Sequence, residues 1–180
     1  YGSGALEKVR ILLDSLKDPV SLCAIDISKE QLQESANIIR KAYPELEVLT
    51  VATDFTSVVK LPNFQRKTKS KVAFFPGSTI GNFEPANAIT FLHSICKTIG
   101  KNGKLLIGVD LKKDYERLLK AYDDSTGITE AFNKNLLSRI NQELGANFNK
   151  NLFRHIVRFN TFEGRIEMHL ESCIDQIVNI

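Results

Sequence analysis

Apolar residues recur every three to four positions in several segments of the chain, and this spacing predicts amphipathic helices. The predicted helices cover 5–17, 28–43, 85–99, 114–122 and 127–144. Between them lie short apolar runs of the kind found in strands buried on both faces of a parallel sheet. The predicted strands cover 20–27, 47–52, 71–76 and 104–111. The polar, lysine-rich segment 56–70 is expected to be irregular.

The alternation of strands and helices predicts an α/β fold with a mostly parallel sheet. Near the end of the chain, segments 155–160 and 165–172 flank a glycine-containing turn, and the second shows strict alternation of apolar and polar residues. This pattern predicts an antiparallel hairpin that adds an edge to the sheet. Since the sequence has neither repeats nor a linker, we expect 1–180 to form a single domain.

Two helix starts carry informative residues. Ser28 followed by Gln31 has the spacing of a capping box, which predicts that the Ser28 side chain caps the next helix. Pro85 suits a first helical turn, because its missing N–H is not needed there.

Composition narrows the class of protein. The 180 residues are 43% hydrophobic and 25% charged, which is ordinary for one globular domain and argues against disorder. The net charge of +3 is small and dispersed, so nucleic acid is not an expected partner. No apolar stretch is long enough to span a membrane, so no membrane partner is expected either.

The cysteines and histidines predict no metal site. The cysteines, at positions 23, 96 and 173, are widely spaced and match neither a disulfide framework nor a zinc pattern. The histidines, at 93, 155 and 169, share no ligand spacing with cysteines or acids. With no visible signal peptide, these features favour a cytoplasmic protein.

The two ends of the chain are unusual. Residues 1–4 already form a glycine-rich turn, which normally follows a buried strand. Residues 173–180 remain apolar without a terminating pattern. We therefore expect the chain to be a fragment of a longer protein, truncated before a first strand.

Candidate site residues cluster where the predicted strands end, because parallel sheets bind ligands at their carboxyl edge. The candidates are Gly2, Ser3, Gly4, Asp26, Asp54, Phe55, Gly77, Ser78, Thr79, Asn82 and Asp110. The glycines allow close backbone approach to a ligand at a helix start. Asp26 lies about 22 residues after the glycine turn, where an acid commonly accepts hydrogen bonds from ribose hydroxyls.

The pattern favours adenosine without a pyrophosphate. The third glycine of a dinucleotide fingerprint is absent near Glu7, which argues against NAD. Asp54 offers an acceptor for an adenine amine, while Phe55 either frames the ring or packs in the core. Lys8 either meets a ligand carboxylate or is a solvated helix residue. Together these residues indicate S-adenosylmethionine.

Six segments of the chain, in order, match one protein family. They are Gly-Ser-Gly-x-x-x-Lys at 2–8, Gly-Ser-Thr-Ile-Gly-Asn-Phe at 77–83, Gly-Val-Asp-Leu at 108–111, Ala-Tyr-Asp-Asp at 121–124, Ala-Phe-Asn-x-Asn-Leu-Leu at 131–137 and Arg-Ile-Glu-Met-His-Leu at 165–170. The chain thus resembles the histidine Nα-methyltransferases of ergothioneine biosynthesis. The resemblance implies a Rossmann-like class I methyltransferase fold and S-adenosylmethionine-dependent trimethylation of L-histidine. A related fungal branch methylates a prenylated tryptophan.

The resemblance also assigns roles by position. It places Gly2, Gly4, Lys8, Asp26, Asp54, Phe55 and Gly77 around the cofactor. Asn82 and Tyr122 would grip the amine and carboxylate of the amino acid as the catalytic pair, with Met168 near the pocket. The family's N-terminal region and its C-terminal imidazole-binding segment have no counterpart here. We therefore expect residues 1–180 alone to be inactive, with self-association as one way to cover an open sheet edge.

Two other classes of function remain open. One is a nicotinamide-dependent reductase, against which the missing third glycine and the lack of a Tyr-x-x-x-Lys pair argue. The other is a nucleotide-binding module without catalytic activity. Binding of S-adenosylhomocysteine or NAD, with and without histidine, distinguishes the three.

Overall fold

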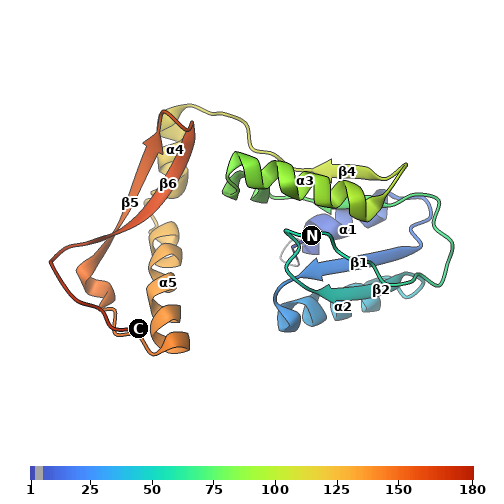
Figure 1. Cartoon of the computed structure of the whole chain (residues 1–180), viewed down its shortest axis with the longest axis horizontal. Coiled ribbons are helices and arrows are strands. Elements are labelled where there is room, and N and C mark those ends of the chain that lie inside the picture. Colours follow the sequence, from blue (N-terminus) through green and yellow to red (C-terminus); the bar gives the residue numbers. More distant parts are fainter. Residues whose placement is uncertain (3–5) are drawn as a thin grey trace. The chain divides into compact units, whose positions relative to one another are not determined.

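The computed structural model describes residues 1–2 and 6–180 (Figure 1). The helices are α1 (Leu6–Ser15), α2 (Lys29–Ala42), α3 (Pro85–Ile99), α4 (Tyr115–Tyr122) and α5 (Ile128–Leu144), with short 3₁₀ turns η2 (Thr79–Asn82) and η3 (Lys150–Leu152). The strands are β1 (Ser21–Asp26), β2 (Glu47–Ala52), β3 (Val72–Phe75), β4 (Lys104–Ile107), β5 (Phe153–Asn160) and β6 (Arg165–Ser172). The chain forms two compact units, Tyr1–Asp110 (unit 1) and Leu111–Ile180 (unit 2).

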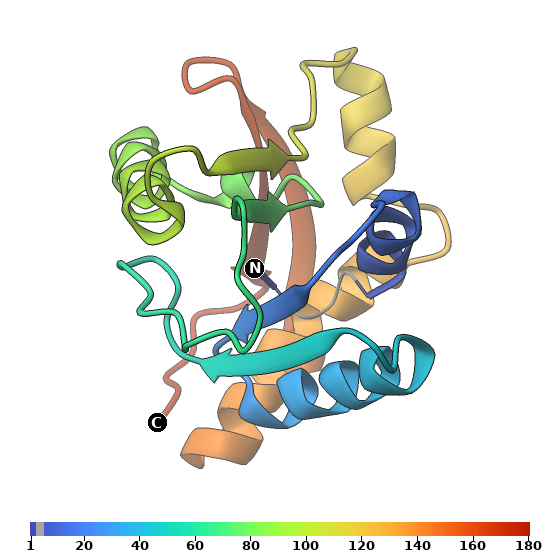
Figure 2. The same ribbon diagram turned by 90° about the vertical axis from the view of Figure 1, so that its right-hand side faces the viewer.

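Unit 1 contains two parallel strand pairs, as Figure 2 shows. β1 pairs with β2 from Ser21↔Glu47 onward, and β3 pairs with β4 from Val72↔Lys104 onward. The predicted parallel pairing is confirmed. The single sheet expected from the sequence is instead present, within the described residues, as separate two-stranded sheets.

The predicted strand over 104–111 is too long, because β4 ends at Ile107. Gly108 N still donates to Phe75 O at 3.0 Å, but the Gly108 carbonyl accepts from Ser78 N at 3.1 Å. The chain after β3 has turned out of the strand at Gly77, whose φ is +80°. An added Cβ on Gly108 would lie 3.1 Å from Gly77 N, so the segments that follow β3 and β4 approach each other closely here.

The capping prediction for α2 is wrong in its detail. Ser28 is the N-cap, with an extended backbone, but its side chain makes no capping hydrogen bond. Instead Ser28 N donates to Asp26 Oδ1 at 3.0 Å. The carboxylate at the end of β1 thereby satisfies a backbone donor that precedes the helix.

Unit 1 buries its apolar residues in two clusters. The first joins α1, α2 and the start of β2, and its buried members are Leu13, Ala36, Ile39, Leu46 and Val48. The second lies around β3 and α3, and its buried members are Ala73, Phe75, Phe91 and Ile95. Tyr1 and Phe55 pack against this second cluster. Each cluster follows the helical or strand period that predicted its element.

A cavity of about 560 Å³ is lined by β1 and β3 together with α1. Tyr1 and Gly2 reach into the space between the two strands, where the N-terminus is marked in Figure 2. The nitrogen of Tyr1 donates to Phe74 O at 3.1 Å, and Gly2 N donates to Ile25 O at 3.0 Å. Consecutive residues therefore bond to strands on opposite sides, as in the interior of a sheet.

Unit 2 is built on the predicted antiparallel hairpin, which is confirmed. β5 and β6 pair from Phe153↔Ser172 to Asn160↔Arg165, and Gly164 in the turn has φ +67°. Within the described residues the two strands form a sheet of their own rather than an edge of a larger sheet. Both α4 and α5 contact the hairpin.

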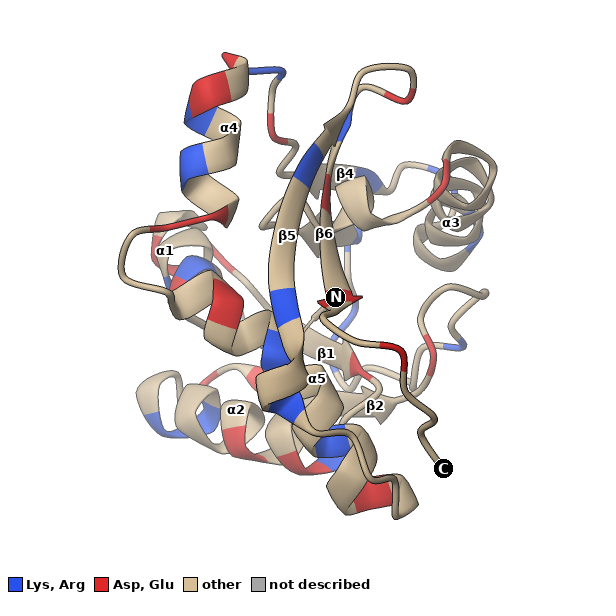
Figure 3. Cartoon of the chain, turned by 90° about the vertical axis from the view of Figure 1, so that its left-hand side faces the viewer, with Lys and Arg blue, Asp and Glu red and all other residues tan. Residues whose placement is uncertain are grey.

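The described surface is mixed in charge. Lys or Arg and Asp or Glu occur together on α1, α2, α4 and α5, whereas α3 carries almost no charge (Figure 3). In the part of the chain that the structure describes, no helix is long and apolar enough to cross a membrane, and no group of three metal-ligating side chains occurs. Burial raises the pKa of the Cys23 thiol to about 11, which agrees with a packing role.

Candidate functional site

The site begins where β1 and β2 end. Gly2 has φ +80°, a conformation that favours glycine, whereas Ser3 of the predicted turn lies outside the described residues. Asp26 closes β1, and its carbonyl accepts from Thr53 N at 2.9 Å, one residue before Asp54. The two predicted acids are therefore brought to neighbouring strand ends. Gly4 lies outside the described residues.

Asp54 is held as an acceptor. Its Oδ1 accepts from the backbone N and the hydroxyl of Thr56, at 2.9 and 2.8 Å. These hydrogen bonds lower the pKa of the Asp54 carboxyl below its ordinary value. Both bonds go to Oδ1, and among the described residues none is formed by Oδ2, which is thus accessible to a ligand.

Phe55 packs against the aromatic cluster of unit 1 and also lies close to the end of β2. Its ring lies 5.9 Å from that of Tyr1 and 6.2 Å from that of Phe75, both in edge-on geometry. The interpretation of Phe55 as a core residue is thus supported by its contacts. The ring is only half-buried, so the cluster fixes it while leaving part of it accessible.

Lys8 and Gly77 come together although they are far apart in sequence. Gly77 has φ +80°, and an added Cβ there would lie 3.7 Å from Lys8 Nζ. Lys8 is an exposed residue, so the solvated lysine expected as an alternative is also present. The Lys8 ammonium nevertheless lies close to the backbone of Gly77, which has no side chain.

Ser78 braces the loop that carries Asn82. Ser78 has φ +59°, and its hydroxyl accepts from Asp110 N at 2.8 Å. Asn82 ends η2 and is exposed, and within the described residues its side chain has no hydrogen-bond partner. The N-cap of α3 is Glu84. Asn82 is therefore not the cap of α3.

The other two predicted substrate residues lie in unit 2. Tyr122 is half-buried at the end of α4, and its carbonyl lies 2.9 Å from His155 Nε2. Met168 lies on β6 opposite Val157 and is 37% exposed. Unit 1 thus holds the predicted cofactor residues with Asn82, whereas Tyr122 and Met168 belong to the other unit.

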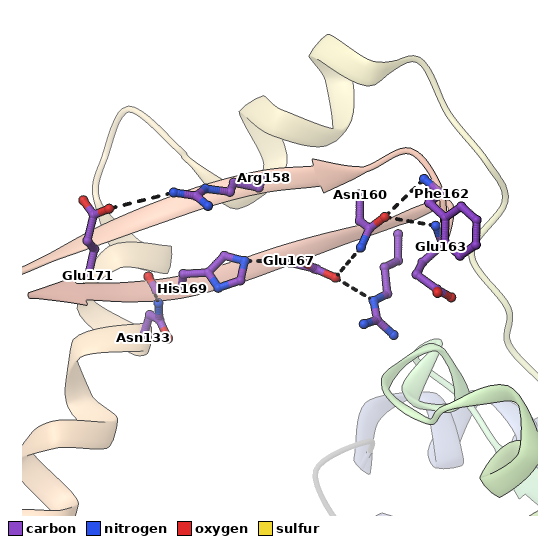
Figure 4. A network of polar contacts seen from close by, with 9 residues as sticks. Asn133, Arg158, Asn160, Phe162, Glu163, Glu167, His169 and Glu171 are labelled. Atoms are coloured by element: carbon purple, nitrogen blue, oxygen red, sulfur yellow. Dashed lines mark hydrogen bonds and ion pairs between the residues drawn. The ribbon is translucent and has the colours of Figure 1, made fainter.

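Polar contacts fill one side of the hairpin (Figure 4). Glu167 accepts from Arg165 Nε at 2.8 Å and from Asn160 Nδ2 at 3.1 Å. The hydrogen bond from Arg165 contributes most, and that from Asn160 next, to lowering the pKa of the Glu167 carboxyl. His169 Nε2 lies 3.3 Å from the same carboxylate. The His169 side chain is exposed at the surface of the hairpin.

Sequence reasoning missed several residues that hold the site. Tyr1 packs against the aromatic cluster beside Gly2, and His155, itself in contact with Asn133, contacts the carbonyl at the end of α4. Asn133 lies in a segment, 131–137, that contributed to the resemblance, so a role for it could have been suspected. His155 carries no pattern of its own, because its partners come from distant segments.

Comparison with known proteins confirms the predicted family resemblance. The family described as histidine-specific, SAM-dependent methyltransferase matches residues 1–180. Histidine N-alpha-methyltransferase from Mycolicibacterium smegmatis is 39% identical, covering 99% of this chain and 56% of the relative. The Mycobacterium tuberculosis enzyme of the same name is also 39% identical, covering 95% and 53%. Ergothioneine biosynthesis protein 1 from Neurospora crassa is 35% identical, covering 80% and 17%. The chain spans about half the length of the bacterial relatives.

Proposed function

The chain belongs to the SAM-dependent, histidine-specific methyltransferase family, and we propose that it forms the cofactor-binding part of an enzyme that methylates the α-amine of L-histidine to trimethylhistidine, the ergothioneine precursor hercynine. The observation that carries this proposal is the edge of unit 1. There Asp26, Asp54 and Phe55 lie at neighbouring strand ends beside the Gly2 turn.

The residues of this edge fit S-adenosylmethionine. Asp26 would accept from the ribose hydroxyls, Oδ2 of Asp54 would accept from the adenine amine, and the fixed ring of Phe55 would face the base. Lys8 beside Gly77 suits the carboxylate of the methionine part, because the glycine leaves room for a ligand under the ammonium. Gly2 and Gly4 would allow the backbone to approach that same part.

The substrate would be positioned by uncharged groups. The bound cofactor supplies an electrophilic methyl group on its sulfonium. The chain's own task is to hold an uncharged amine lone pair in line with that methyl, and positioning of this kind accelerates a reaction strongly. The exposed amide of Asn82 and the hydroxyl of Tyr122 would grip the carboxylate and amine, and Met168 would line the pocket.

A central strand would complete the fold. The cavity between β1 and β3 has the backbone donors and acceptors of two strands along its sides, and Tyr1 and Gly2 already bond to both. A strand running into Tyr1 would join the two pairs into one class I methyltransferase sheet in the order β2, β1, new strand, β3, β4. A second copy of the chain covering this open edge is the alternative occupant.

Several broader features follow from the same proposal. Units 1 and 2 would form one catalytic domain over 1–180, in agreement with the extent of the family match. The free cysteines suit a reducing cytoplasm. The partner would be a small amino acid rather than nucleic acid, because the charge is small and of mixed sign.

The test is a mass-spectrometric assay of the full-length protein with S-adenosylmethionine and histidine. We expect mono-, di- and trimethylhistidine, and calorimetry should detect binding of S-adenosylhomocysteine but not NAD. Methylation of a tryptophan derivative instead would move the protein to the related branch. NAD binding would favour a reductase, and cofactor binding without turnover of either amino acid would indicate a non-catalytic module.

A further inference from the structure

The end of α4 is tied to two other elements of unit 2 through one imidazole. His155 of β5 places Nε2 at 2.9 Å from the carbonyl oxygen of Tyr122. Its other ring nitrogen, Nδ1, lies 2.9 Å from Nδ2 of Asn133 on α5. Asn133 Nδ2 also lies 3.1 Å from the carbonyl oxygen of His169 on β6, a contact drawn in Figure 4. One hydrogen-bond network thus links α4, α5 and both hairpin strands.

The chemistry of these partners fixes the ring's proton. The carbonyl of His169 can only accept, so Asn133 must turn its NH₂ group toward it. Because the same nitrogen faces His155 Nδ1, that ring nitrogen must also accept. The imidazole is then neutral with its proton on Nε2, which donates to the Tyr122 carbonyl. With this assignment, each N–H that Asn133 and His155 contribute to the network has an acceptor.

The carbonyl of Tyr122 needs such a partner. The last carbonyls of a helix have no donor within the helix, and a side chain or solvent must satisfy them. Just beyond, the Asp124 carboxylate accepts from the backbone nitrogens of Ile128 and Thr129 in the first turn of α5, at 3.0 and 2.8 Å. The backbone that carries the Tyr122 ring is therefore held on both sides.

We propose that His155 is a positioning residue for Tyr122, and that Asn133 keeps His155 in the tautomer that donates to the Tyr122 carbonyl. The proposal rests on the proposed function, in which the Tyr122 hydroxyl orients the amino-acid substrate. His155 acts through the backbone of Tyr122. A shift of the helix end would move the phenol hydroxyl away from the substrate while leaving the cofactor edge of unit 1 unchanged.

Two substitutions at one position separate the bonds. In the full-length enzyme, His155→Gln keeps an amide nitrogen near the place of Nε2 and hence the bond to Tyr122, whereas His155→Asn keeps an acceptor near Nδ1 and hence the bond to Asn133. We expect His155→Asn to raise the KM for histidine about three- to tenfold, the scale of one lost hydrogen bond. His155→Gln should stay within about twofold of wild type, and S-adenosylhomocysteine affinity should not change in either variant.

Equal histidine KM values for the two variants, or a parallel loss of cofactor affinity, would overturn the proposal. If both variants fail to fold, ¹⁵N NMR of the wild-type imidazole decides: we expect a proton on Nε2 alone at neutral pH, and a proton on Nδ1 would overturn the assignment. Tyr122→Phe in the same assay, with Tyr115→Phe as control on the same helix, tests the underlying function. If Tyr122→Phe leaves histidine methylation unchanged, the proposed role of Tyr122 fails, and the positioning proposal falls with it.

Discussion

Unit 1 and unit 2 are stabilised by different means. Unit 1 buries two apolar clusters, and Phe75 and Phe91 are each 1% exposed. In residues 111–180, all of which the structure describes, Leu137 is the one buried hydrophobic residue. Unit 2 is instead cross-linked by polar side chains, among them His155, Asn133 and Asp124.

The difference matches the proposed division of labour. A rigid apolar core suits a unit that holds a large, fixed ligand at its strand ends. A hydrogen-bonded unit with few buried contacts opens locally at lower free energy, which suits the part that must accept and release an amino acid through three methylations. Variants that affect one unit and spare the other test this comparison.

The largest expected effect is on the core of unit 1. Phe91→Ala should lower the free energy of unfolding by about 3–5 kcal/mol, because it removes a fully buried ring from the aromatic cluster. Phe132→Ala in unit 2 is the matched control, since that ring is 72% exposed, and it should cost less than about 0.5 kcal/mol. Urea unfolding of the full-length variants measures both. A cost at Phe132 similar to that at Phe91 would break the comparison.

The next largest expected effect is on cofactor binding at the strand ends of unit 1. Asp26→Ala should weaken S-adenosylhomocysteine binding by about 1–3 kcal/mol, because a charged acceptor is lost at the end of β1. Asp18→Ala removes an exposed carboxylate of the same unit, one that pairs with Arg66, and serves as the control. Isothermal calorimetry on the full-length protein measures the affinities. Equal affinities for wild type and Asp26→Ala would refute the ribose assignment.

Asn82→Ala should raise the KM for histidine about tenfold while the cofactor affinity and melting temperature stay near wild type. The side chain is exposed and caps no helix, so its loss should not destabilise the fold. Asn87→Ala, at another exposed asparagine nearby on α3, is the control. A lower melting temperature with unchanged kinetics would show that Asn82 has a structural role.

The smallest expected effect is at the junction of α4 and α5. Hydrogen bonds, led by that from the Thr126 hydroxyl, lower the pKa of Asp124. The unfolded state therefore binds its proton more readily, so the stabilisation is present at neutral pH and is lost as pH falls below the ordinary aspartate range. Asp124→Ala should lower the melting temperature by about 2–4 °C at pH 7, and by less in strong acid.

Asp123→Ala is the control for this last effect. The Asp123 carboxylate is adjacent in sequence but does not accept the hydrogen bonds from Ile128 N and Thr129 N that Asp124 accepts. Calorimetric melting of both variants across an acid pH series gives the comparison. A difference between them that grows as pH falls would contradict the assigned direction.

Local patterns predicted the elements well, and contacts between distant residues were predicted poorly. The 3.6-residue period located all five helices, and alternation located the hairpin. Ser28 illustrates the limit: its spacing with Gln31 predicted a capping box, but the Ser28 side chain makes no capping bond, and its backbone N–H donates to the Asp26 carboxylate at the end of β1.

The site divides in the same way. The positions of Asp26, Asp54 and Gly77 at strand ends followed from the sequence, because the carboxyl edge of a parallel sheet is fixed by chain direction. The sequence did not indicate that Lys8 meets Gly77 or that His155 meets Tyr122, since these residues are separated by long stretches of chain.

The sequence by itself determined the helices, the parallel and antiparallel pairs, the family and the candidate cofactor residues, because each depends on local period, chain direction or ordered motifs. Tertiary structure alone decided that Phe55 is held by Tyr1 and Phe75, that Asn82 is free of a capping role, and that the His155 ring lies within hydrogen-bonding distance of the carbonyl at the end of α4. These outcomes depend on which donors, acceptors and rings packing brings within a few ångströms of one another, and no local pattern encodes that.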